Sequence, residues 1–178
     1  MELNAEQATR WITSEPLDLD ALLAETADPR CGALAIFGGL VREQNDGRPV
    51  SGMTYDAHVV LAAKTLAELE LEVRERFGVE QCRIVHRTGP LQVEEASVYV
   101  VVRSAHRRAG LRAAEYAIDT LKERLPVWKE EHYVDGPSRF LAGTALTPTE
   151  APADSPTDPA NAPAPDAPSS DRNEFDDA

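Results

Sequence analysis

The chain has 178 residues, of which 42% are hydrophobic, and it carries a formal net charge of −13. This length and apolar content predict one globular domain with a real core. The acidic balance argues against a general nucleic-acid-binding protein, which needs a basic face for phosphates. The charge is uneven, because residues 144–178 hold eight acidic residues, one arginine and seven of the thirteen prolines. We expect a disordered acidic tail there and a folded domain over residues 1–143.

The N-terminus and the cysteines favour a soluble cytoplasmic protein. The opening MELNAEQATRWITSEPL has neither a basic nor an apolar signal-peptide region, and no apolar run reaches the ~18 residues of a membrane-spanning helix. Cys31 and Cys82 lack the spacing of a zinc site or a redox CxxC motif, so we expect two buried or half-buried thiols. The four histidines show no i, i+4 pairing. We therefore assign no metal and no cofactor, and expect binding to neither nucleic acid nor membrane.

The first part of the chain predicts a short helix followed by two strands. Leucines with helical spacing favour a helix within residues 17–33. Segment 32–43 is strand-like, and its paired glycines indicate a bulge or a close backbone approach. The turn signal NDGRP comes next, and segment 50–58 then alternates as a strand does. We therefore expect residues 32–58 to form a hairpin with a longer loop.

From Val59 the apolar spacing becomes helical and continues to Phe77, with Gly78 as a typical end signal. Segment 81–91 predicts a strand that ends at a Gly-Pro pair. Segment 96–106 is rich in β-branched residues and continuous enough to lie at the centre of a sheet.

A second amphipathic helix follows and stops at Pro126, because proline disfavours the helical region for the residue before it. Segment 128–136 then predicts a last strand and turn. The helix positions expected to face inward are Leu111, Ala114, Ile118, Leu121 and Leu125. Hairpins and helices mix without strict βαβ alternation, which favours an α+β, two-layer domain with a mixed or antiparallel sheet and two main amphipathic helices.

Basic residues gather at the junction between the central strand and the second helix. The stretch SAHRRAG places His106, Arg107 and Arg108 at a helix N-terminus, where cations are unfavourable unless an anion is bound. Arg42 follows the glycine-containing strand at a loop. The pattern fits either an anion site or ordinary solvated surface charge.

Two lysines flank the helix end in LKERLPVWKEE. Pro126 redirects the chain between Lys122 and Lys129, so these side chains can converge. Two nearby ammonium groups disfavour each other's charge, which lowers the pKa of one of them. A lysine so tuned can act as a nucleophile or as a general acid or base. The alternative is that Lys122 complements the helix dipole and Lys129 is an exposed strand residue.

Four stretches occur in order within about residues 30–135: VR after the glycine-containing strand, HRTGPL, SAHR and LKERLPVWK. Together they resemble the family of the large, catalytic subunit of molybdopterin synthase. The resemblance implies an α+β fold with a hammerhead-like element. It also implies a sulfurtransferase that converts cyclic pyranopterin monophosphate into the dithiolene molybdopterin. The sulfur donor would be the thiocarboxylated C-terminal Gly-Gly of a small ubiquitin-like subunit, with one such subunit at each end of a central homodimer.

Carried over motif by motif, the resemblance assigns catalysis to Lys122 and Lys129, with Lys122 ranked first. It assigns substrate binding to Arg42, His106 and Arg107. These roles suit an anionic substrate and an anionic thiocarboxylate, both of which a cationic pocket stabilises.

Some positions depart from the family pattern. Leu40 stands where the family often has lysine, and His58 where tyrosine is common. Arg108 is a further candidate contact, and Arg139 is the candidate for an arginine that the family can contribute across the dimer. The departures leave two alternatives open: a non-catalytic module that binds a ubiquitin-like protein tail, and an unrelated phosphate-binding α+β enzyme.

Overall fold

The computed structural model describes residues 3–141, so the predicted acidic tail over 144–178 lies outside the described residues. The helices are α1 (Ala5–Ala8), α2 (Leu19–Glu25), α3 (Val59–Phe77) and α4 (Arg107–Arg124). The strands are β1 (Ile12–Thr13), β2 (Ala33–Leu40), β3 (Gln44–Asn45), β4 (Arg48–Ala57), β5 (Gln81–Arg87), β6 (Gly89–Gln92), β7 (Ala96–Ser104), β8 (Val127–Tyr133) and β9 (Arg139–Leu141).

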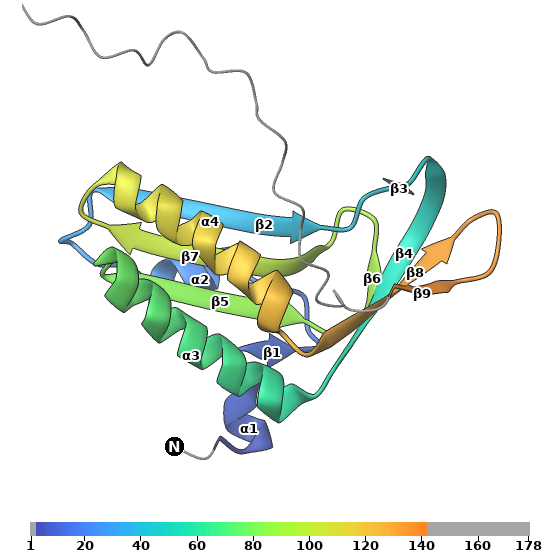
Figure 1. The fold of residues 1–178 in the computed structure, drawn as a ribbon, viewed down its shortest axis with the longest axis horizontal. Coiled ribbons are helices and arrows are strands. Elements are labelled where there is room, and N and C mark those ends of the chain that lie inside the picture. The colour runs from blue at the N-terminus through green and yellow to red at the C-terminus, as the bar shows by residue number, and fades with distance from the viewer. Residues whose placement is uncertain (1–2, 142–178) are drawn as a thin grey trace, which may run out of the picture. The chain divides into compact units, whose positions relative to one another are not determined.

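The first sheet has the strand order β1-β5-β7-β2, and α3 and α4 cover one of its faces while α2 covers the other (Figure 1). Strand β7 lies between β5 and β2 and is antiparallel to both, which confirms its predicted central position. Strand β1 runs parallel to β5, so the sheet is mixed. The α+β class with two main amphipathic helices is confirmed.

Helix α4 lies on this sheet through small side chains. A Cβ at Gly110 would meet Ser104 Oγ at 2.7 Å, so any larger residue would require the Ser104 side chain to move. Ala113 and Ala117 are fully buried. Leu111, expected to face inward, is 62% exposed instead. At about 100° per residue, the stripe centred on the buried alanines turns Leu111 toward solvent.

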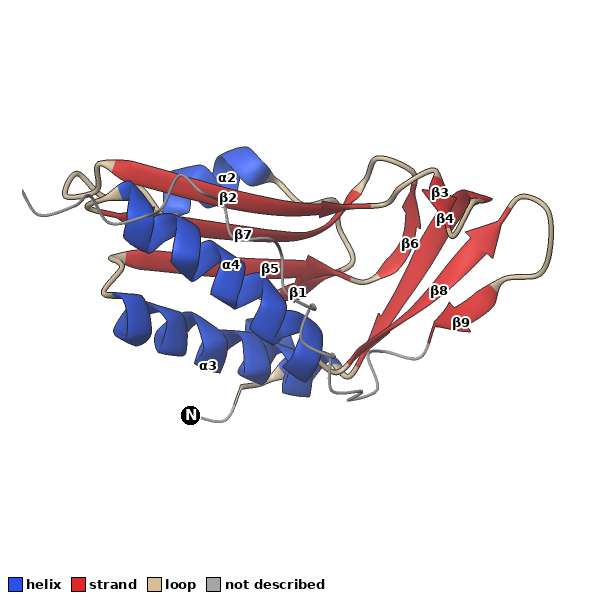
Figure 2. Cartoon of the chain, turned by 45° about the horizontal axis from the view of Figure 1, so that its top comes forward, coloured by secondary structure: helices blue, strands red, loops and turns tan. Residues whose placement is uncertain are grey.

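The second sheet is built around β4, which pairs with β3, β6 and β8, while β8 also pairs with β9 (Figure 2). The predicted hairpin over residues 32–58 is therefore wrong, because β2 pairs with β7 and not with β4. Ala35 and Phe37 of β2 pack into the core with α4 and β7, so β2 belongs in the first sheet. The tight hairpin is β3–β4, whose turn residues Asp46 and Gly47 have φ of +50° and +75°, as a type I′ turn requires.

The predicted strand over residues 81–91 is divided between the two sheets. Strand β5 ends at Arg87, and β6 starts at Gly89, whose φ is +84°. That left-handed conformation favours glycine, and it redirects the chain so that β6 pairs with β4. Both sheets therefore meet beside the end of α4, where the candidate site lies.

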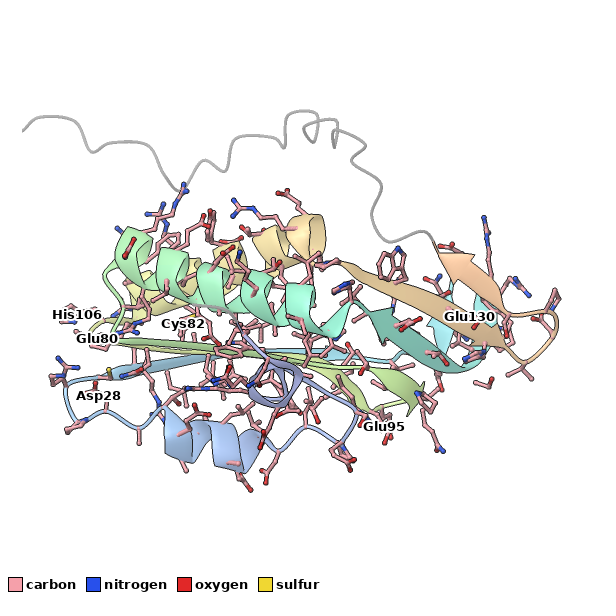
Figure 3. The ribbon with its side chains drawn as sticks, turned by 90° about the horizontal axis from the view of Figure 1, so that it is seen from below. Asp28, Glu80, Cys82, Glu95, His106 and Glu130 are labelled. Atoms are coloured by element: carbon pink, nitrogen blue, oxygen red, sulfur yellow. The ribbon has the colours of Figure 1, made fainter. Side chains whose placement is uncertain are left out.

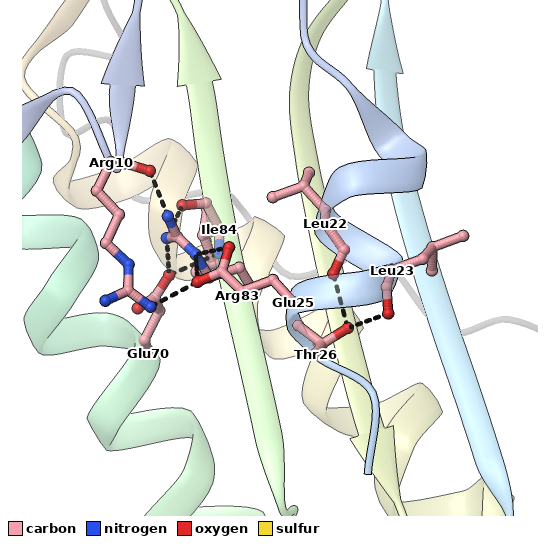
Figure 4. A network of polar contacts seen from close by, with 8 residues as sticks. All are labelled: Arg10, Leu22, Leu23, Glu25, Thr26, Glu70, Arg83 and Ile84. Atoms are coloured by element: carbon pink, nitrogen blue, oxygen red, sulfur yellow. Dashed lines mark hydrogen bonds and ion pairs between the residues drawn. The ribbon is translucent and has the colours of Figure 1, made fainter.

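A buried arginine joins α2, α3 and β5 on the sheet. The Arg83 guanidinium donates to Glu70 at 2.7 Å and to Glu25 at 3.2 Å, and it also donates to the carbonyl oxygen of Arg10 (Figure 4). Arg83 is only 4% exposed. Its charge is thus compensated by two carboxylates, as a buried ion requires.

We expect Arg83→Leu to lower the free energy of unfolding by about 3–5 kcal/mol, because it leaves the Glu70 carboxylate buried without its partner. Urea denaturation measures this change. Arg10→Leu is a matched control, since the Arg10 side chain is 58% exposed and pairs with the same Glu25 at 2.6 Å. Loss of such an exposed pair should change stability by less than about 1 kcal/mol. Equal effects of the two substitutions would contradict this account.

The two cysteines are free thiols. Cys82 is buried and Cys31 half-buried, and neither forms a disulfide, as predicted. Burial raises the pKa of both thiols. Within residues 3–141, no three His, Cys, Asp or Glu side chains are grouped as a metal site would require. None of the helices in this range is long and apolar enough to cross a membrane.

Candidate active site

A pocket of about 740 Å³ lies where the C-terminal end of α4 meets β2 and the second sheet. Its lining comes from β2, β4, β5, β7, α4 and β8. The volume is within the range of small-molecule sites. Three of the basic residues singled out from the sequence, Arg42, Lys122 and Lys129, line this one pocket.

The break at Pro126 positions the two lysines. Leu125 caps α4 in an extended conformation with φ −73° and ψ 122°, as a residue before proline prefers. Lys122 therefore stays in the last turn of α4, while Lys129 lies on β8. Among the described residues, Lys122 has no ion-pair partner, so its ammonium is available to a bound anion.

A buried carboxylate connects Lys129 with Arg42. Glu131 is 2% exposed, and its Oε1 lies 3.6 Å from Lys129 Nζ. Its Oε2 accepts hydrogen bonds from Tyr133 at 2.7 Å and from Asn45 Nδ2 at 2.8 Å. The Asn45 Oδ1 accepts in turn from Arg42 Nη2 at 3.0 Å. One carboxylate thus holds two pocket cations, the lysine directly and the arginine through Asn45.

We expect Glu131→Gln to lower kcat/KM for the pocket's reaction by about 10- to 100-fold, because Lys129 loses its fixed counter-charge. Steady-state kinetics measure the loss. Glu130→Gln is a matched control on the same strand. In a Lys129→Ala background, Glu131→Gln should have little further effect if it acts through the lysine. An equal loss in both backgrounds would mean that Glu131 is only structural.

Two aromatic side chains, Tyr55 and His86, also line the pocket. The Tyr55 and His86 rings are 5.0 Å apart at 75°, in edge-to-face contact. His86 is 5% exposed, and its Nδ1 lies 2.8 Å from the carbonyl oxygen of Arg87. Burial lowers the pKa of His86 to about 4 and raises the pKa of the Tyr55 phenol. Both side chains are therefore neutral at physiological pH.

The low pKa of His86 predicts an acid-sensitive component of stability. Between pH 6.5 and 4 the unfolded chain binds a proton at this histidine and the folded chain does not. The free energy of unfolding should therefore decrease as the pH is lowered from 6.5 to 4, by about 3 kcal/mol in total. Urea denaturation at several pH values, compared with His86→Phe, measures the component. Parallel pH curves for the two proteins would contradict the prediction.

The other basic residues singled out from the sequence lie elsewhere in the chain. His106, Arg107 and Arg108 are at the N-terminal end of α4, and Arg107 is about 22 Å along the helix from Lys122. His106 lies near Glu80 and Asp28, far from Glu130 on the second sheet (Figure 3).

Arg139 is exposed on β9 and does not line the pocket. A single chain therefore brings together three of the seven basic residues that the sequence analysis singled out, and it leaves the other four outside the pocket.

Sequence reasoning missed Glu131, Asn45, Tyr55 and His86 as parts of the site. A glutamate in KEE reads as an exposed charge, although Lys129, Glu131 and Tyr133 share one face by strand alternation. His86 stands in the HRTGPL stretch, which was used for the resemblance without a role for the histidine. The pairing of β4 with β8 is what reveals these residues.

The comparison with known families decides the identity. A family model described as "MoaE protein" matches residues 12–124. This chain belongs to the MoaE family. The MoaE match covers the elements from β1 to the end of α4, including Arg42 and Lys122. It stops short of Lys129, which is on β8.

Individual relatives of this MoaE chain agree with the family. A Bos taurus protein named molybdopterin synthase catalytic subunit is 38% identical over 128 residues, covering 72% of this chain and 68% of the relative. A Nostoc protein of the same name is 38% identical over 132 residues, covering 74% of this chain and 80% of the relative. A crystal structure described as molybdopterin synthase from Staphylococcus aureus has a TM-score of 0.71 at 36% identity, covering 75% of this chain and 97% of that chain.

Proposed function

We propose that this chain is the catalytic subunit of a molybdopterin synthase, a sulfurtransferase. It would transfer sulfur from the thiocarboxylated C-terminus of a small ubiquitin-like subunit to cyclic pyranopterin monophosphate, forming the dithiolene. The observation that carries the proposal is the single pocket lined by Arg42, Lys122 and Lys129. The names of the relatives support the same reaction.

The pocket suits a reaction between two anions. The substrate phosphate and the incoming thiocarboxylate are both negative and repel each other, so their approach needs positive charge already in place. Lys122, without an ion-pair partner among residues 3–141, is our candidate for the proton donor or acceptor at the reacting atoms. Lys129 and Arg42, held through Glu131, are candidates for anion binding. A fixed cation costs no reorganisation when the charge develops.

We propose that the catalytic subunit works as a homodimer joined along β2. This strand is at the edge of the first sheet and pairs with β7 alone in the part of the chain that the structure describes. It exposes Leu34, Ile36 and Leu40, at 42%, 42% and 55%. An apolar edge strand left open invites pairing with another chain, and a second copy of β2 provides a self-complementary partner.

Such a dimer brings the remaining basic residues to the pocket. Two β2 strands related by a two-fold axis are antiparallel, and so are the α4 helices that lie beside them. The N-terminal end of one α4 then faces the C-terminal end of the other. His106 and Arg107 of one copy would join Lys122 of its partner, which accounts for their separation within one chain.

Reconstitution tests the proposal. The purified protein is mixed with cyclic pyranopterin monophosphate and a thiocarboxylated small subunit, and the dithiolene product is measured by its oxidised fluorescent derivative. We expect product with the thiocarboxylated subunit and none with the unmodified carboxylate form. Binding of the small subunit without product would favour the non-catalytic binding module instead.

We also propose a cytoplasmic location. The two thiols of the chain, Cys31 and Cys82, form no disulfide, as is usual in a reducing compartment. Cell fractionation with an antibody to the chain tests the location, and recovery in a membrane or secreted fraction would contradict it.

A further inference from the structure

The candidate pocket has two chemically different groups of lining residues. Arg42, Lys122 and Lys129 are basic and accessible, and the side chain of Lys129 is 40% exposed. Tyr55 and His86 also line the pocket and are neutral, and His86 is buried while Tyr55 is half-buried. Tyr55 on β4 pairs directly across from Lys129 on β8. A ligand that fills the pocket therefore meets both cations and uncharged polar atoms.

The hydrogen bonding of His86 fixes which ring nitrogen is free. The carbonyl oxygen of Arg87 can only accept, so the Nδ1 atom 2.8 Å away must carry the hydrogen. Burial holds the pKa of His86 at about 4, so the ring carries no second proton near neutral pH. The Nε2 atom is then an acceptor, and it has no hydrogen-bond partner within residues 3–141. Because His86 lines the pocket, its small exposed surface opens there.

The Ser97 hydroxyl, which also lines the pocket, is not a donor to this nitrogen. The Ser97 hydroxyl donates its hydrogen to the carbonyl oxygen of Gly39 at 3.0 Å. The edge-to-face contact with Tyr55 needs only an aromatic ring at position 86. A phenylalanine would satisfy that packing without adding an unpaired acceptor to the pocket lining. A histidine at this position is therefore better explained by binding of a ligand than by packing of the core.

We propose that His86 Nε2 accepts a hydrogen bond from an N–H group on the heterocyclic end of the substrate, and so determines specificity for a pterin-type ring. This inference rests on the proposed function and adds the recognition of the ring to that of the phosphate. A pterin carries ring N–H and amino donors, which match a neutral acceptor. Its phosphate end would lie among Arg42, Lys122 and Lys129. His86 is thus a substrate-recognition residue and takes no part in moving sulfur.

Three variants and two ligands test the proposal. In the reconstituted reaction, His86→Phe should raise KM for cyclic pyranopterin monophosphate by about 10- to 100-fold. The single-turnover rate at saturating substrate should change by less than about threefold. The inhibition constant of inorganic phosphate should stay at the wild-type value, because the cations are untouched. His86→Gln, which keeps an acceptor, should recover part of the affinity. His132→Gln should have no effect, because His132 is on β8 and does not line the pocket.

Two results would overturn the proposal: an unchanged substrate KM in a folded His86→Phe protein, or an equal weakening of substrate and phosphate. Circular dichroism and thermal melting establish that each variant is folded. Fluorescence titration with a phosphate-free pterin provides a readout that does not need the small subunit. If the wild-type protein binds this pterin but forms no dithiolene, the proposed function fails and the His86 comparison still stands. If the wild-type protein forms dithiolene and His86→Phe binds the pterin as tightly, only the His86 proposal fails.

Discussion

Lys122→Ala is expected to reduce dithiolene formation by about 10²- to 10⁴-fold, the range typical of losing a positioned acid–base group. The lysine is in the last turn of α4, lines the pocket, and has no ion-pair partner in the described part of the chain. Its removal leaves the two anionic reactants with less positive charge and no ammonium at that position. Single-turnover product formation with the thiocarboxylated small subunit measures the loss.

A matched control for this substitution is Lys64→Ala. Lys64 is on α3, is 60% exposed and pairs with Glu68 at 3.8 Å, so its loss should leave the rate unchanged. Thermal melting should show both variants folded, since neither lysine is buried. A full rate for Lys122→Ala would remove the lysine from the chemistry and with it the main role assigned to α4.

Mixing two inactive variants should restore activity if the site is shared between copies of the chain. Lys122→Ala and Arg107→Ala homodimers would each lack one part of both pockets. In a mixed dimer, one pocket carries both lesions and the other carries neither. Random exchange makes about half of the dimers mixed, so about one quarter of the wild-type activity should return. Product formation after denaturing and refolding the mixture measures this recovery.

A site contained within one chain predicts the opposite result. If Lys122 and Arg107 served one pocket within a single chain, every pocket in the mixture would keep one lesion, and no activity would return. Lys122→Ala mixed with Lys129→Ala is the control, because both lysines line the same pocket of one chain. A mixed dimer of these two has one lesion in each pocket, so this mixture should stay inactive.

The elements with strong local signals could be predicted from the sequence. Helix α3 follows its apolar spacing from Val59 to Phe77, and Gly78 ends it with φ +60°. Strand β7 follows its β-branched run, and Pro126 ends α4 as expected. In each case the signal lies within the element or directly beside it, so no distant contact is needed to interpret it.

Strand pairing could not be predicted in the same way, because it depends on partners far along the chain. The hairpin expected over residues 32–58 failed since β2 finds its partner in β7. The buried carboxylate of Glu131 depends on β8 lying beside β4. The convergence of Lys122 and Lys129 on one pocket could be predicted from the sequence, because Pro126 between them is a local signal. The separation of His106 from the pocket could not be predicted, because it depends on the length and direction of α4 in the folded chain.

Helix α4 has a further consequence that follows from its length. His106 precedes its first turn and Lys122 is in its last. In the proposed dimer, one helix therefore spans the distance between two reaction centres. One inserted residue would rotate everything beyond it by about 100° and shift it by about 1.5 Å, and would disturb both centres at once. The spacing between SAHR and LK is thus under tighter constraint than the residues between them.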